Sequence, residues 1–233
     1  MAGILRPDVR AIAWWVLVGT AAGTLAGFVV GGVGGRLAML LLRLTSPDDV
    51  LGLTSDDGFE IGVVSADTVQ LLLAMAMLGG INGVLYAAVR TALPEWVRLP
   101  LWVALAVTLG GATIVHEDGI DFTLLEPAAL GIALFVVLPG VAAALVVVLV
   151  ERWAEREPWA SRRLTVGVCL AALAGTFALG VAALVGAAAL AIRRAGLGES
   201  ARTLGRIAVP LGLAAVTVVT GWQLLTESIR ILD

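Results

Sequence analysis

The chain has 233 residues, of which 60% are hydrophobic and 14% are charged, and its formal net charge is −3. Soluble domains carry roughly 25% charged residues, so this composition excludes an ordinary soluble protein. We expect the lipid bilayer as its surroundings and no nucleic-acid partner.

Apolar stretches long enough to cross about 30 Å of hydrocarbon recur along the chain. They predict six transmembrane helices, near residues 11–44, 68–90, 99–116, 124–150, 164–192 and 207–226. The connecting segments are too short to form a soluble domain. The sequence therefore predicts an all-α polytopic membrane bundle, with residues 1–233 forming a single transmembrane domain.

The first predicted helix has a glycine at every fourth position, and we call these five residues the glycine ladder: Gly19, Gly23, Gly27, Gly31 and Gly35. Each costs about 1 kcal/mol of helix propensity relative to alanine, but small residues at this spacing let a neighbouring helix approach closely. Four residues advance an α-helix by about 400°, so a single straight neighbour cannot meet all five. We expect a packing surface used by one obliquely crossing helix or by two helices, within the chain or between subunits, and the remaining alternative is close approach of a lipid or cofactor.

Arg36 directly follows the glycine ladder, and Arg43 lies on the same helix face. An arginine within the hydrocarbon costs about 2.5 to 3.5 kcal/mol on insertion scales, so an acidic partner or a route to the interface is expected. The candidate partners of Arg36 are carboxylates of the connecting segments: Asp57, Glu60, Glu117, Asp121 and Glu126. Two interpretations stay open, an ion-pair network that holds the loops over the bundle, or a site for an anion or a lipid headgroup.

The segments 45–67 and 116–126 carry ten carboxylates and no arginine. Carboxylates suit a divalent cation, and the weak candidates for metal ligands are Asp56, Asp57, Glu60, Glu117, Asp118 and Asp121. The spacing of an EF-hand loop is absent, and aspartate followed by glycine is an ordinary turn signal. We therefore expect neither a metal site nor a cofactor.

The second predicted helix places Asn82 and Tyr86 at mid-depth, and with Arg36, His116 and Glu126 these are the candidate ligand-binding residues. One interpretation of Asn82 and Tyr86 is a neutral-ligand pocket or a passive path, and the other is hydrogen bonding between helices. His116 is the only histidine, so a multi-histidine zinc or haem site is excluded for one chain. Its expected role is a polar residue of the outer connection, and the alternatives are pH sensing or a role as a lone ligand.

Arginine is expected at the cytoplasmic ends of the helices. It occurs before the first predicted helix, between the second and third, and between the fourth and fifth, which predicts that both termini are cytoplasmic and that the acidic segments are outside. The stretch Glu151 to Arg163 mixes both signs and is interpreted as an ordinary solvated connection. One connection disagrees with this orientation, since it would leave four arginines outside: Arg193, Arg194, Arg202 and Arg206.

Four stretches of the chain resemble uncharacterised polytopic membrane proteins of high-GC bacteria: Gly34 to Met39, Leu44 to Pro47, Asp56 to Gly62 and His116 to Pro127. The resemblance covers about the first 150 residues, and Asp121 to Pro127 is its most distinctive part. It implies a multi-pass protein of the plasma (inner) membrane and assigns no activity to any residue.

Nucleophile-elbow, phosphate-loop and dinucleotide-binding fingerprints are absent from the sequence. We therefore expect a non-enzymatic membrane protein with a binding or assembly role, organised by the first helix, with a second copy or another membrane subunit as candidate partner. The alternative is a channel or transporter for a small neutral or anionic solute, with Arg36, Asn82 and Tyr86 along its path. A lipid-modifying membrane enzyme is the third hypothesis.

Overall fold

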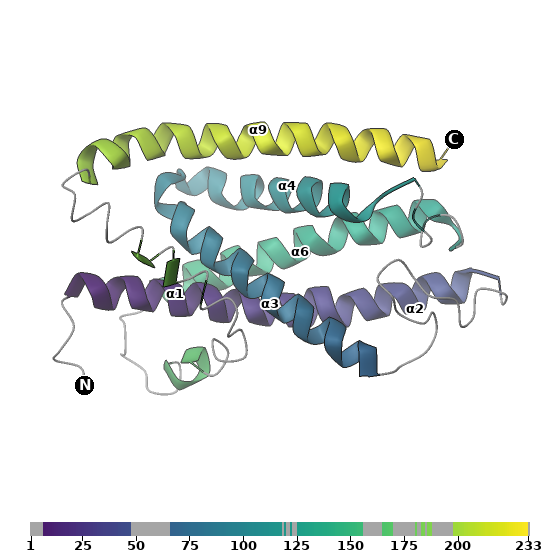
Figure 1. Cartoon of the computed structure of the whole chain (residues 1–233), viewed down its shortest axis with the longest axis horizontal. Coiled ribbons are helices and arrows are strands. Elements are labelled where there is room, and N and C mark those ends of the chain that lie inside the picture. Colours follow the sequence, from purple (N-terminus) through teal and green to yellow (C-terminus); the bar gives the residue numbers. More distant parts are fainter. Residues whose placement is uncertain are drawn as a thin grey trace.

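The computed structural model describes residues 7–47, 66–117, 119, 122, 125–155, 165–169, 180, 183, 184, 186, 187 and 198–232. Its elements in chain order are α1 (Pro7–Ala26), η1 (Gly27–Gly34), α2 (Gly35–Thr45), α3 (Ala66–Val89), η3 (Arg90–Ala92), α4 (Glu95–Ile114), α6 (Ala128–Ala154) and α9 (Gly198–Leu232) (Figure 1). All of them are helical, so the predicted all-α class is confirmed.

Five helices of the described part are long and apolar enough to cross a membrane: Arg10–Thr45, Ala66–Ala92, Glu95–Ile114, Ala128–Ala154 and Thr203–Leu232. They coincide with five of the six predicted spans, and the bundle is therefore of the multi-pass membrane type. The predicted span 164–192 lies largely outside the described residues, as does most of the acidic segment 45–67.

The first span is one continuous helix in which α1, η1 and α2 follow each other in line (Figure 1). Its 36 residues from Arg10 to Thr45 measure about 54 Å at α-helical rise, well beyond the hydrocarbon thickness, so the helix tilts or extends past the interface. The eight residues of η1 form a π-helix. Half of them are glycines, which lack a Cβ and so accommodate both a widened turn and a close neighbour.

The first span lies at the centre of the bundle and α9 lies at its edge. In Figure 1, α3 crosses α1, whereas α9 runs alongside α4. In the most apolar window of each helix, 56% of the residues of the first span are buried, against 6% for α9. The exposed apolar side chains of α9 accordingly face the surroundings, which for a membrane protein are lipid.

Two apolar cores fill the two ends of the bundle. One joins α1, α3, α4 and α6 around Trp14, Tyr86 and Trp102. The other joins α2, the end of α4, the start of α6 and α9 around Leu42 and Phe135. Together they bury most of the large apolar side chains that the four inner helices direct at one another.

The beginning of α1 and the end of α9 lie at opposite ends of the bundle (Figure 1). At one end, the Arg90 guanidinium lies 4.1 Å from the ring centroid of Trp15. At the other end, Arg230 of α9 lies 3.5 Å from Glu117, just after α4. The beginning of α1 and the end of α9 thus lie at opposite ends of the bundle, whereas the arginine pattern predicts both termini on one side of the membrane.

The direction of α9 removes the disagreement in the arginine distribution for Arg202 and Arg206, whereas Arg193 and Arg194 lie outside the described residues. The helix begins at the end of the bundle where α6 finishes and runs toward the end that holds Glu117 and Arg230 (Figure 1). Arg206 near its beginning therefore lies at the same end as Arg90 and Arg98, as the arginine rule requires. The expected orientation assumed that helices alternate strictly from 164–192 to 207–226, and hydropathy alone does not fix that direction.

Candidate functional site

The helices α1 and α3 meet backbone to backbone through glycines on both sides. A Cβ added to Gly19 would lie 2.7 Å from the carbonyl oxygen of Gly83. One added to Gly23 or Gly27 would also come within 3.0 Å of the α3 backbone, a separation that real Cβ atoms essentially never show. The contact is reciprocal, since a Cβ on Gly79 or Gly83 would meet the α1 backbone just as closely. This surface therefore excludes every side chain larger than hydrogen.

The remaining members of the glycine ladder lie in looser surroundings. A Cβ on Gly31 would be 3.3 Å from the side chain of Met75, which still belongs to α3. Gly34, between the last two ladder positions, faces Leu138 of α6 at 3.1 Å. A Cβ on Gly35 would meet nothing within 4 Å, so Gly35 is not part of a close helix contact within the described residues.

The π-helix explains how one neighbour meets the ladder from Gly19 to Gly31. In an α-helix, four residues exceed a full turn, so glycines spaced by four drift steadily around the axis. A π-helix closes its hydrogen bonds from i to i+5 and needs more than four residues per turn, so the drift reverses within η1. Gly31 thereby stays on the α3 side of the helix.

Four side chains from three helices and one short connection meet at the arginine-rich end of the bundle, and we call them the Glu151 cluster: Tyr86, Arg90, Arg98 and Glu151. The Tyr86 hydroxyl donates to Glu151 Oε1 at 2.6 Å. Arg90 donates from Nε to Oε1 at 3.0 Å and from Nη2 to Oε2, a bidentate pair. Arg98 Nη1 lies 3.4 Å from the same Oε2. One carboxylate of α6 thus joins α3, η3 and α4.

The local sequence places these groups together. Asn82, Tyr86 and Arg90 follow each other at intervals of four and so lie along one face at the end of α3. Arg98, in the first turns of α4, donates from Nε to the carbonyl oxygens of Arg90 and Leu93, at 3.1 and 3.2 Å. It thereby adds to the hydrogen bonds at the end of η3, where the Arg90 carbonyl oxygen also accepts the Leu93 N–H at 3.2 Å.

Two tryptophan side chains pack against the Glu151 cluster. Trp15 of α1 stacks on the Arg90 guanidinium, and Trp102 of α4 packs on Tyr86 with ring centroids 5.3 Å apart. The Trp102 indole donates to Asn82 Oδ1 at 3.0 Å. Asn82 and Tyr86, the two predicted site residues of the second span, therefore both bind other helices of the chain.

The other predicted ligand-binding residues belong to the opposite end of the bundle. Arg36 donates from Nη2 to the hydroxyl of Thr68 near the start of α3. His116 Nε2 lies 3.1 Å from the Thr113 carbonyl oxygen, and it is exposed. Arg36, His116 and Glu126 are thus separated along the bundle from Asn82 and Tyr86, so the five candidates do not form one site.

Glu126 makes its described contacts through its main chain. Its amide donates to Ser46 Oγ at 2.8 Å, and its carbonyl accepts from Thr45 Oγ1 at 2.7 Å. These bonds hold the end of α2 against the segment that leads into α6.

The described residues contain no group of three or more potential metal ligands. Among the weak metal candidates, Glu117 is described and pairs with Arg230 at 3.5 Å. The others lie outside the described residues: Asp56, Asp57, Glu60, Asp118 and Asp121. The absence of a metal site therefore stays a prediction.

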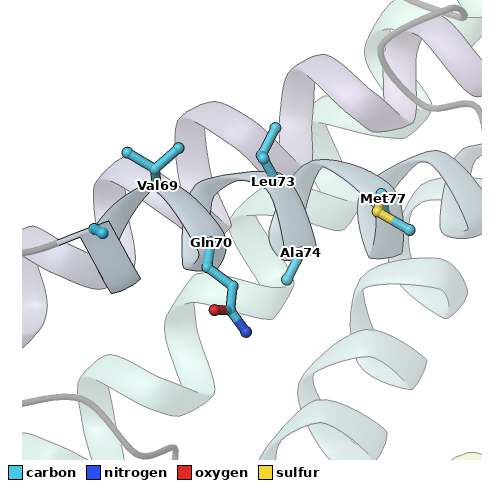
Figure 2. Close-up of a pocket in the computed structure, with 6 residues that line it drawn as sticks. Val69, Gln70, Leu73, Ala74 and Met77 are labelled. Carbon is cyan, nitrogen blue, oxygen red and sulfur yellow. The ribbon is translucent and has the colours of Figure 1, made fainter.

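A shallow groove of about 580 Å³ lies on the outer face of α3, and Figure 2 shows it. It is lined by Ala66, Val69, Gln70, Leu73, Ala74 and Met77. All six come from one helix, and Gln70 is the only polar side chain among them. The groove lies at the start of α3, away from the Glu151 cluster at its end.

Sequence reasoning missed three members of the Glu151 cluster. The mixed charges of Glu151 to Arg163 predict a solvated connection, yet the Glu151 side chain is only 26% exposed and accepts hydrogen bonds from three residues. One signal was present, because Arg90 follows Tyr86 at the helical interval of four. The partner on α6 is 61 residues away from Arg90 and carries no such local signal.

Comparison of the chain with family models, with curated proteins and with solved structures finds no match.

Proposed function

We propose that the chain is a non-enzymatic integral protein of the plasma membrane, with a binding or assembly role organised by its first helix. The observation that carries the proposal is the glycine contact between α1 and α3. Because no side chain separates the two backbones, many dispersion contacts hold the pair, and a small displacement loses most of them. This supports a fixed helix pair around which the other helices, and other subunits, are placed.

Polar side chains within the spans support the same role. Asn82 accepts the Trp102 indole N–H at 3.0 Å, and the hydroxyls of Thr108 and Thr220 lie 2.8 Å apart. Each contact joins two helices, as expected of residues that stabilise a bundle. Each also occupies groups that a solute path would use, so we rank transport second.

Solute flux separates these two functions. The purified protein is reconstituted into liposomes, and efflux of trapped glycerol and chloride is compared with that from protein-free liposomes. We expect equal efflux. A flux that Asn82→Ala and Arg36→Ala abolish, while Thr113→Val leaves it unchanged, would replace the proposal by a transporter. Thr113 suits the control because its hydroxyl bonds only to its own helix.

The assembly role is tested by counting chains. Protein with one fluorophore on a terminal tag is reconstituted at less than one chain per vesicle on average, and bleaching steps are counted per vesicle. We expect two or more steps in most occupied vesicles, or a second subunit that co-purifies at a fixed ratio. Uniform single steps from the pure chain argue against assembly. A change in extracted membrane lipids that depends on the chain would favour the third hypothesis, an enzyme.

A further inference from the structure

The Glu151 cluster holds one more positive charge than negative charge. The side chains of Arg90 and Arg98 are 12% and 17% exposed, and both guanidinium groups share the Glu151 carboxylate. The Tyr86 hydroxyl also donates to this carboxylate, so its two oxygens already accept four hydrogen bonds. A carboxylate offers about four acceptor positions, and Glu151 is therefore saturated.

Glu95 compensates little of this excess. Its oxygen lies 4.0 Å from Arg98 Nη1, but its side chain is 89% exposed, so water screens the interaction. No other carboxylate of the described residues pairs with Arg90 or Arg98. A surplus positive charge in a site that is mostly closed to water favours binding of an anion.

Each guanidinium still has donors for such an anion. Arginine carries five N–H groups. Arg90 uses Nε and Nη2 on Glu151, and Arg98 uses Nε on two carbonyl oxygens and Nη1 on Glu151. Within the described residues, Arg90 Nη1 and Arg98 Nη2 have no protein acceptor. Neither nitrogen is among the fully buried unsatisfied atoms, so neither is completely closed to solvent.

The expected depth of the cluster in the membrane limits the classes of ligand that could bind there. Trp96, two residues before Arg98, is exposed, and Trp15 stacks on Arg90, whereas Trp102 is buried in the apolar core. Indole rings gather at the level of lipid headgroups. The arginine-rich end of a membrane protein faces the cytoplasm, so the two guanidiniums lie at the depth of the phosphates of the inner leaflet.

We propose that Arg90 and Arg98 together bind a phosphate group at the cytoplasmic interface, supplied by an anionic phospholipid headgroup or by free phosphate. Guanidinium forks match phosphate oxygens in geometry and form charge-assisted hydrogen bonds. Glu151 orients both arginines but does not neutralise both. The inference relies on the membrane location in the proposed function and not on the assembly role.

The test measures binding with two probes. The full-length protein in an uncharged maltoside detergent is titrated with inorganic phosphate. In parallel, nanodiscs of phosphatidylcholine alone are compared with nanodiscs that contain phosphatidylglycerol, with thermal unfolding as the readout. We expect a rise in Tm with phosphatidylglycerol, with inorganic phosphate or with both. A response to phosphatidylglycerol alone identifies the headgroup as the source, whereas a response to both shows that the phosphate group suffices.

Matched variants decide whether the arginine pair is responsible. Arg98→Gln should weaken binding about tenfold or more, whereas Arg152→Gln should leave it unchanged, since Arg152 is an exposed arginine at the same end. Equal binding by wild type and Arg98→Gln, or equal loss in Arg152→Gln, overturns the proposal, as does a lack of response to both probes.

A second variant keeps the test decisive if Arg98→Gln does not fold. Glu151→Gln removes the competing carboxylate charge, so its Tm should rise more with phosphatidylglycerol or phosphate than that of the wild type. A purely structural role of the cluster predicts no such increase, and an unchanged or smaller rise contradicts phosphate binding. Oligomer counting and flux do not enter this test, so its failure leaves the proposed function untouched.

Discussion

The Tyr86 hydroxyl of α3 lies 2.6 Å from Glu151 Oε1 of α6. The tyrosine is completely buried, so this bond anchors the end of α3 to α6 inside the bundle. It also fixes the carboxylate that Arg90 and Arg98 share. The contact therefore couples the apolar core at this end to the charged groups at the membrane surface.

Replacing Tyr86 by phenylalanine should lower the stability of the bundle by about 1 to 2 kcal/mol. The ring still fills its site, but a hydrogen bond to a charged acceptor is lost. Thermal unfolding in detergent measures the change. Thr113→Val serves as the control, because its exposed hydroxyl bonds only to the Gly110 carbonyl oxygen of the same helix. Equal Tm values for the two variants would show that the Tyr86 bond contributes nothing.

Two positions of the glycine ladder should respond in opposite directions to the same change. Gly23→Ala forces a methyl group into the α3 backbone, and we expect a loss of several kcal/mol or failure to assemble the bundle. No heavy atom of the described residues lies within 4 Å of a Cβ added to Gly35, so Gly35→Ala should be neutral or stabilising by up to about 1 kcal/mol. Size-exclusion profiles and Tm in detergent distinguish these results. Similar losses at both positions would contradict the described contact.

The end of α9 should be accessible from the side of the membrane opposite to Glu95. In a Cys169→Ser background, single cysteines replace Glu95 or Leu232, both of which are exposed. A membrane-impermeant maleimide applied to intact protoplasts should label the Leu232 position only, and permeabilised cells should show labelling of both. Labelling of both positions in intact protoplasts, or of neither, would contradict the opposite placement.

The hydroxyl pair between α4 and α9 should contribute modestly to stability. Thr108 and Thr220 lie 2.8 Å apart, and hydrogen bonds between membrane helices average about 0.6 kcal/mol. A double-mutant cycle with Thr108→Val and Thr220→Val should therefore give a coupling energy of about 0.5 to 1 kcal/mol. Strictly additive effects would mean that the two hydroxyls do not interact.

The helical class and five apolar spans are predictable from the sequence because they depend on composition and on local patterns. Which helices contact each other cannot be predicted from composition and local patterns. The glycines at 79 and 83 read equally well as helix breaks around a site, and only their meeting with Gly19 and Gly23 shows their packing role. The spacing of the glycine ladder predicts which face of the helix is packed. It does not predict which helix packs there, because that depends on contacts between residues far apart in the sequence.

The Glu151 cluster shows the same limit for charged residues. Arg90, Arg98 and Glu151 each stand at the end of an apolar stretch, where charges usually contact water. A charge that enters the bundle and one that faces solvent look alike in a hydropathy profile. The direction of α9 could not be predicted for a related reason. Hydropathy averaged over a window identifies a span but does not give its direction across the bundle.

The π-helical segment η1 sets the angular phase between the two halves of the first span. Its eight residues wind more slowly than α-helical ones, so Arg36 and Arg43 emerge at an azimuth that an unbroken α-helix would not give them. More than four residues per turn means less than about 90° of rotation per residue, so removing one residue from this segment would change the azimuth of everything beyond it. The length of the segment thereby dictates which side of the bundle receives the two cationic side chains, although neither of them lies within it.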